Sequence, residues 1–153
     1  MAEYNPFHLG HLYHIRKSLE TARADSLVAV ISSNFVQRGE PAMIDKGVRA
    51  MMALSCGVDL VLELPVAFSS HNAGPFSDAA VDILAATGQV DVISFGMETP
   101  REGVPMLLRM ADILNDEPHR FKFALKKNLS AGYSFVQARS ASLEEIVPGS
   151  EDL

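Results

Sequence analysis

The sequence is 153 residues long, 48% hydrophobic and 21% charged, which predicts one globular domain with an ordinary core. No apolar run approaches the ~18 residues of a membrane span and no signal peptide is recognisable, so we expect a cytoplasmic protein without membrane contact. A single cysteine excludes an internal disulfide, and no cluster of Cys and His has zinc spacing. Thirteen basic against nineteen acidic residues give a net charge of -6, which argues against wholesale binding to a phosphate backbone.

The first half of the chain alternates helical patterns with short apolar runs rich in β-branched residues. This alternation predicts an α/β fold, with a Rossmann-like parallel sheet flanked by helices. Residues 1–4 lead directly into a turn at Asn5-Pro6, so we expect the sheet to lack a full first strand and to leave two edges open. A helix is expected at 11–22 and a strand at 26–32. Asp45 then offers an N-cap for a helix that stops before Gly57.

Two further strands are expected at 59–62 and 91–95, because both runs are short, apolar and bounded by turn-forming residues. Between them, Ser77 or Asp78 is a candidate cap for a helix that ends at Gly88.

After residue 100 the pattern is helical only, with apolar stripes at 104–114 and 121–129 and a third helix at 134–146. We therefore expect a Rossmann-like nucleotide-binding core over 1–100 and a helical segment over 101–153 that continues the same domain. Residues 119–139 hold five cations and no acid. This stretch is either an RNA-facing patch or a solvated helix face, and the pattern leaves both open.

The stretch AEYNPFHLGHLYH at 2–14 carries the strongest chemical signal, because a turn delivers His8, Gly10 and His11 to the start of a helix. Amides at a helix start attract phosphate, imidazoles donate hydrogen bonds to oxygens that gain charge, and glycine permits close approach of a nucleotide. Together they suit attack on an α-phosphate. A capping or surface histidine is the simpler alternative, and a metal held by His8, His11 and His14 is another. We predict no metal site, because no carboxylate lies at helical spacing among these histidines.

HLGH fits the HxGH signature of the nucleotidyltransferase superfamily, which also includes class I aminoacyl-tRNA synthetases. The longer segments AEYNPFHLGHLYH, SNFVQRGEPAMIDK, GVDLVLELP and the dipeptide FG at 95–96 resemble, in this order, the tRNA-Met cytidine acetate ligase family. LSAGYSFVQAR at 129–139 is similar to the family segment that precedes an all-helical, tRNA-binding remainder.

The resemblance implies that ATP and acetate form acetyl-adenylate and pyrophosphate, and that the acetyl group passes to N4 of the wobble cytidine in elongator tRNA-Met. The pyrophosphate is expected to leave as a Mg²⁺ complex. Two other readings stay open: a small-molecule adenylyl- or cytidylyltransferase with the same HxGH device, and a non-catalytic domain that binds nucleotide or RNA.

The resemblance also implies site residues. His8 and His11 would be catalytic and contact the ATP phosphates, Gly10 would lie beside the nucleotide, and Gly96 would approach the adenosine through its backbone. The implied ATP-binding set is Ala2, Glu3, Tyr4, Asn5, Pro6, Phe7, His8, Gly10, His11 and Gly96. Three cations, Arg38, Lys46 and Arg49, are expected to contact phosphate or acetate.

The sequence departs from the family pattern in several places. Leu9 stands where the family commonly has Asn, and Gly47 stands where a Trp is usual, which lowers helix stability by about 1 kcal/mol relative to Ala. The family also has a strand before Ala2 and, beyond Leu153, an SPN segment and an Arg that complete the ATP site. We therefore expect this chain to be a shortened form.

Overall fold

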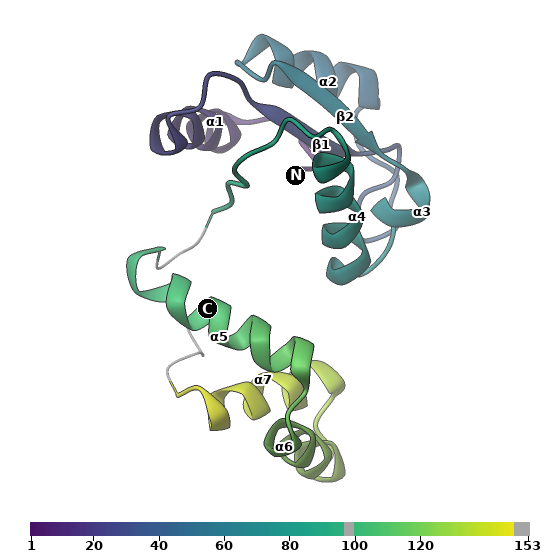
Figure 1. Ribbon diagram of the computed structural model, residues 1–153. Helices are drawn as coiled ribbons and strands as arrows, with labels where there is room; N and C mark the ends of the chain where they lie inside the picture. The colour runs from purple at the N-terminus through teal and green to yellow at the C-terminus, as the bar shows by residue number, and fades with distance from the viewer. Residues whose placement is uncertain (97–99, 149–153) are drawn as a thin grey trace. The chain divides into compact units, whose positions relative to one another are not determined.

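The computed structural model describes residues 1–96 and 100–148, and the chain divides into two compact units, Met1–Phe95 and Gly96–Leu153 (Figure 1). The first unit contains a two-stranded parallel sheet, in which β1 (Val28–Ser32) pairs with β2 (Leu60–Leu64) in register from Val28↔Leu60 to Ser32↔Leu64. Its helices are α1 (Leu9–Ala22), α2 (Lys46–Ser55), α3 (Val66–Ser69) and α4 (Ala73–Ala86). The predicted α/β class with parallel strands is confirmed.

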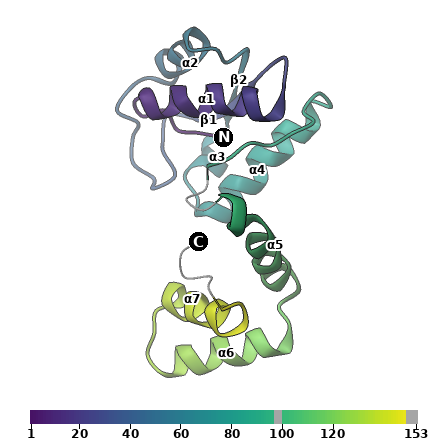
Figure 2. The same ribbon diagram turned by 90° about the vertical axis from the view of Figure 1, so that its left-hand side faces the viewer.

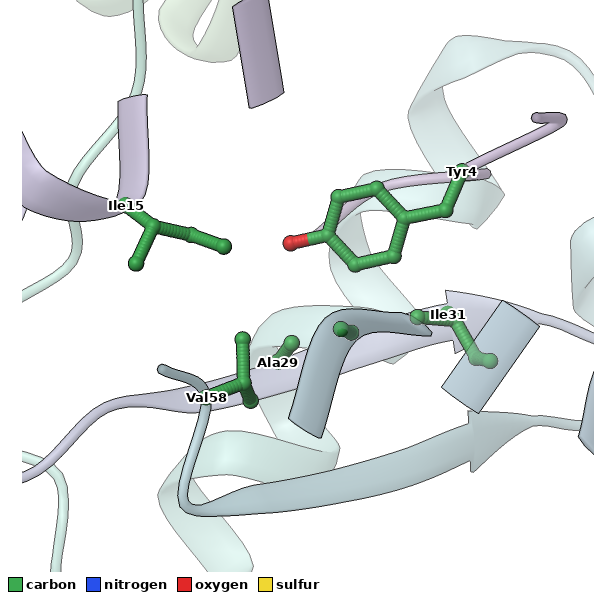
Figure 3. Close-up of a cluster of buried hydrophobic side chains, with 6 residues drawn as sticks. Tyr4, Ile15, Ala29, Ile31 and Val58 are labelled. Atoms are coloured by element: carbon green, nitrogen blue, oxygen red, sulfur yellow. The ribbon is translucent and has the colours of Figure 1, made fainter. Parts of the chain in front are cut away.

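Helices cover both faces of the sheet because successive side chains of β1 point to opposite sides. Ala29 and Ile31 face α1 and α2, where they join a buried cluster (Figure 3). That cluster consists of Tyr4, Ile15, Ala29, Ile31, Ala53 and Val58. Val30 points the other way and packs with Leu64 of β2 and with Ala80 and Leu84 of α4. Burial on both sides explains why β1 reads as a continuous apolar run.

The free edge of β1 is partly covered by the chain's first residues. The Ala2 amide donates to the carbonyl of Val30 at 2.9 Å, and the Ser32 amide donates to the carbonyl of Ala2 at 3.2 Å. This parallel bridge places the segment that leads to His8 at the carboxyl end of β1. In parallel α/β sheets ligands bind at that end.

Two predictions about this unit are wrong. Residues 91–95 are not a strand, because the described part of the chain offers them no neighbouring strand to bond; instead, Ser94 Oγ lies 2.7 Å from Ser18 Oγ of α1. Helix α4 begins after Asn72 rather than at Ser77 or Asp78. The earlier start places Pro75 in the first turn, where a proline costs no intrahelical hydrogen bond.

The second unit is helical in its described residues, as predicted. It comprises α5 (Pro100–Asp116), α6 (His119–Ser130) and α7 (Phe135–Ile146). Helices α6 and α7 lie against each other (Figure 2), and Phe121 of α6 and Ala138 and Leu143 of α7 are buried. A buried hydrogen bond of 3.1 Å joins Asn128 to Ser142 across this pair. That both units act as one domain remains a prediction.

Within residues 1–96 and 100–148, no helix combines the length and apolar character that a membrane crossing needs.

Candidate functional site: the histidine turn before α1

The two histidines of the HLGH motif form the N-terminal cap of α1. His8 is the N-cap residue, and its Nδ1 accepts a hydrogen bond from the Gly10 amide at 3.1 Å. The Nδ1 of His11 accepts in turn from the His8 amide at 3.2 Å. Because a neutral imidazole has one accepting and one donating nitrogen, both Nε2 atoms then carry the proton. No described residue hydrogen-bonds to either Nε2, so two N–H donors are available at the start of the helix.

The two rings are stacked, with centroids 3.7 Å apart and planes inclined by 24°. Behind them, Tyr4 makes an edge contact with His11 at 4.9 Å between centroids, and Phe7 lies 5.4 Å from the same ring. This aromatic packing fixes the orientation of His11, while His8 stays exposed. Partial burial lowers the pKa of His11, and the neighbouring His8 and His14 lower it further. Both effects favour the neutral ring at neutral pH.

Gly10 lies directly against the ring of His8. A Cβ atom at position 10 would lie 2.9 Å from His8 Cε1 and 3.0 Å from its Nδ1, closer than side chains normally approach. The glycine therefore leaves room for the histidine cap. Its predicted place beside the nucleotide is a separate matter and remains a prediction. The amides of Gly10 and His11 both bond to His8, so the imidazole Nε2 atoms rather than these amides are the donors open to a ligand.

The side chains of the segment Ala2–Phe7 make several contacts within the protein. Tyr4 is buried in the core cluster, and its backbone adopts a left-handed φ of 50°. The side chains of Glu3 and Asn5 reach across to the following loop, where Glu3 Oε1 accepts from the Gln37 amide and Asn5 Oδ1 accepts from the Met43 amide, both at 2.7 Å. This segment thus anchors the loop at 33–45. Whether its backbone or Pro6 also touches ATP remains a prediction.

Arg38 lies at the tip of that anchored loop. A turn closed by the Gly39 amide and the Val36 carbonyl at 2.8 Å presents Arg38 to solvent, and Gly39 has the positive φ of 77° that such turns favour. Among residues 1–96 and 100–148, none forms an ion pair with Arg38. The side chain is thus exposed and without an acidic partner in this part of the chain, and its contact with phosphate or acetate remains a prediction.

Lys46 begins α2 but is already paired. Its Nζ lies 2.7 Å from both carboxylate oxygens of Glu63, and Ser33 Oγ donates to Glu63 Oε1 at 2.6 Å. These hydrogen bonds hold the pKa of Glu63 below its ordinary value. Lys46 would have to share this carboxylate with a phosphate or acetate. Ser33 and Glu63 were not predicted as site residues, because they lie 30 residues apart and no local pattern joins them.

Arg49 is placed differently from what we predicted. Its side chain is fully buried, and all the acceptors of its guanidinium are backbone carbonyls or a serine hydroxyl. This placement does not support direct contact with phosphate or acetate. Arg49 is buried because α2 brings it to the carboxyl end of β1, where the carbonyls of Glu3 and Ser33 need hydrogen-bond donors.

Gly96 belongs to the second unit, whereas the histidine turn belongs to the first. The approach of Gly96 to the adenosine therefore remains a prediction. Residues 1–96 and 100–148 bring no three His, Cys, Asp or Glu side chains into a group suited to a metal.

Comparisons with known proteins identify the family of this chain. Residues 1–152 match the family described as HIGH Nucleotidyl Transferase. The tRNA(Met) cytidine acetate ligase of Thermoanaerobacter sp. (strain X514) is 45% identical over 151 residues, which are 99% of this chain and 37% of that protein. The Thermotoga maritima protein of the same name is 49% identical over 141 residues, which are 92% of this chain and 33% of that one.

A crystal structure of Thermotoga maritima TmcAL bound with alpha-thio ATP superposes with a TM-score of 0.88 at 48% identity, covering 95% of this chain and 35% of that one. This chain therefore spans about a third of the length of these relatives. The resemblance predicted from the motifs is confirmed: the chain belongs to the HIGH nucleotidyl transferase family, and within it resembles the tRNA(Met) cytidine acetate ligases.

Proposed function

We propose that this chain is the nucleotide-binding part of an ATP-dependent acetate-tRNA ligase. In this proposal it activates acetate as acetyl-adenylate, and the acetyl group then passes to N4 of the wobble cytidine of elongator tRNA-Met. The observation that carries the proposal is the stacked pair of His8 and His11, whose Nδ1 atoms cap α1 and whose Nε2 atoms remain available as donors. The names of the relatives and the ATP analogue bound to one of them support it.

The two imidazoles would act on the triphosphate of ATP. One acetate oxygen attacks the α-phosphorus, a new P–O bond forms, and the bond from the α-phosphorus to the α,β-bridging oxygen breaks with its electron pair leaving on pyrophosphate. Negative charge therefore grows on the pyrophosphate oxygens. The Nε2–H groups of His8 and His11 donate hydrogen bonds to these oxygens. These bonds are stronger in the transition state than in bound ATP, because the oxygens then carry more charge, and the barrier is lowered. No proton needs to leave either ring.

Mg²⁺ and tRNA complete the proposal. Mg²⁺ would be supplied together with ATP and would offset the negative charge of its phosphates. The acid-free stretch 119–139 is the candidate RNA contact. Two of its cations pair with outside acids, Lys122 with Glu117 and Lys127 with Glu145. The others are exposed and have no ion-pair partner among residues 1–96 and 100–148: Arg120, Lys126 and Arg139. A tRNA substrate would place the protein in the cytoplasm.

Acetate-dependent exchange of pyrophosphate into ATP tests the first step. We expect the exchange to disappear in the double variant H8A/H11A and to persist in His71→Ala, which removes an exposed histidine outside the site. Undiminished exchange in the double variant would refute the role of the imidazoles. Exchange that requires a phosphorylated alcohol instead of acetate would indicate a small-molecule nucleotidyltransferase. A folded chain that binds no ATP in calorimetric titration would indicate a non-catalytic domain.

A further inference from the structure

Arg49 is a fully buried charge in the first unit, and it is bonded to neutral groups only. Nε donates to the carbonyl of Ile44 at 2.9 Å, and Nη1 donates to the carbonyl of Glu3 at 2.6 Å and to Ser32 Oγ at 3.2 Å. Nη2 donates to the carbonyl of Ser33. No carboxylate of the described residues forms an ion pair with it. Burying a guanidinium is costly, and here its hydrogen bonds to these acceptors offset part of that cost.

The acceptors of Arg49 belong to the two segments that carry the predicted phosphate ligands. Glu3 lies in the segment that leads to the histidine turn, whereas Ser33 and Ile44 lie at the two ends of the loop that presents Arg38. Glu3 and Asn5 bind the middle of the same loop through the amides of Gln37 and Met43. Two sets of hydrogen bonds thus join the histidine turn to the loop. One is made by the side chains of Glu3 and Asn5, and the other by the guanidinium of Arg49.

Arg49 could also act on the phosphates through its positive charge at a distance, but the charges around it do not favour this alternative. The carboxylates of Glu3, Asp45 and Glu63 lie near enough to Arg49 to interact with it through space. Together with Lys46, these groups leave no excess of positive charge around Arg49. Its contribution to the site must therefore come from the carbonyls that it holds.

We infer that Arg49 is a positioning residue, which fixes the histidine turn and the Arg38 loop relative to each other so that both face one triphosphate. This inference rests on the proposed function. It differs from the contact first predicted for Arg49, because the side chain acts through the backbone of other residues and does not reach the ligand. A small displacement of binding groups is enough to weaken a preorganised site strongly.

The test compares Arg49→Lys and Arg49→Met with Arg16→Met, a control that removes an exposed cation of α1 and has the same net charge as Arg49→Met. Lysine keeps the charge but has three N–H donors on one atom, so it cannot hold four acceptors spread around a planar group. Melting by circular dichroism checks folding, calorimetry measures the affinity for ATP and for adenosine, and amide hydrogen exchange is followed residue by residue.

We expect folded Arg49→Lys to bind ATP about tenfold more weakly while its affinity for adenosine changes much less. The amides of Gln37 and Met43 should exchange faster than in the wild type, whereas those of the β1–β2 ladder should not. Arg49→Met should show the same pattern more strongly if it folds, and Arg16→Met should show none of it.

ATP affinity within about twofold of the wild type in folded Arg49→Lys would overturn the inference, since a misplaced site must bind less well. Equal acceleration of exchange in the loop and the ladder would also overturn it, because a merely stabilising side chain predicts that result. If the wild type binds no ATP, the proposed function fails separately. The exchange pattern, which needs no ligand, then still decides whether Arg49 couples the turn to the loop.

Discussion

His8 has two tasks in this structure, and a single substitution separates them. Its Nδ1 accepts from the Gly10 amide, and its Nε2 remains available as a donor. In His8→Asn, the amide oxygen Oδ1 occupies the same position along the side chain as Nδ1, whereas nothing reaches as far as Nε2. Asparagine is among the preferred N-cap residues. The variant therefore keeps the cap of α1 and loses the phosphate donor.

The two tasks predict different magnitudes. Loss of an N-cap costs about 1 kcal/mol, which is about 4 °C in melting temperature for a domain of this size. His8→Asn should keep that contribution, and His8→Ala should lose it. Loss of a donor to an oxygen that gains charge costs about 3 kcal/mol in the transition state, a factor of roughly one hundred to one thousand in rate. Both variants should lose it equally.

Thermal melting and acetate-dependent ATP-pyrophosphate exchange measure these effects in parallel. We expect His8→Asn to melt within about 1 °C of the wild type with exchange reduced at least a hundredfold, and His8→Ala to show the same loss of exchange with lower stability. Exchange in His8→Asn close to that of the wild type would show that His8 only caps the helix. That result would reduce His8 to a structural feature of α1.

Three other predictions concern the same site. Gly10→Ala should lower ATP affinity, because the new Cβ would lie 2.9 Å from His8 Cε1 and displace the ring, while the lost cap and the better helix propensity of alanine leave stability little changed; unchanged calorimetric titration with ATP would contradict this. Arg38→Gln should leave the melting temperature unchanged, since the side chain is exposed at a loop tip, and should raise the KM for ATP about tenfold; an unchanged KM would mean that Arg38 is only solvated. Stability should fall as the pH drops below 6.5, because the pKa of His11 is lower in the folded chain and the unfolded chain then binds more protons. The contribution is fully present above pH 6.5 and is lost as the pH falls through the folded pKa of His11. In His11→Asn, whose side chain also accepts a hydrogen bond but does not titrate in this range, the melting temperature should depend less on pH between 5 and 7, and an unchanged slope would refute the assignment.

Local signals in the sequence identified most of the elements. Asp45 was predicted to cap α2, and its Oδ1 does accept from the Gly47 amide at 2.8 Å. Such a cap depends on residues two or three positions apart, so the sequence alone contains it. The same geometry explains why Gly47 is tolerated in the first turn. A Cβ there would lie 3.0 Å from the capping oxygen of Asp45, and the cap partly offsets the low helix propensity of glycine.

Features that depend on distant neighbours were not predictable in the same way. Residues 91–95 have the composition of a strand, but a strand exists only where another strand offers its hydrogen-bonding groups. The hydrogen-bond and ion-pair partners of the three cations predicted to bind phosphate or acetate also depend on distant residues. Arg38, Lys46 and Arg49 were all expected to contact phosphate or acetate, yet only Arg38 has no acid or carbonyl partner among the described residues. Those partners lie up to 46 residues away, where no periodic pattern announces them.

The use of histidine in both capping positions is itself informative about the reaction. An aspartate or serine would accept from the helix amides as well, but would present no second nitrogen to a ligand. Protonation would turn both Nδ1 atoms into donors and break the two hydrogen bonds that they accept. The stacked rings, 3.7 Å apart, also oppose a double positive charge. The pKa of His11 is lowered, and in the proposed reaction the two rings would assist departure of pyrophosphate as hydrogen-bond donors rather than as acids.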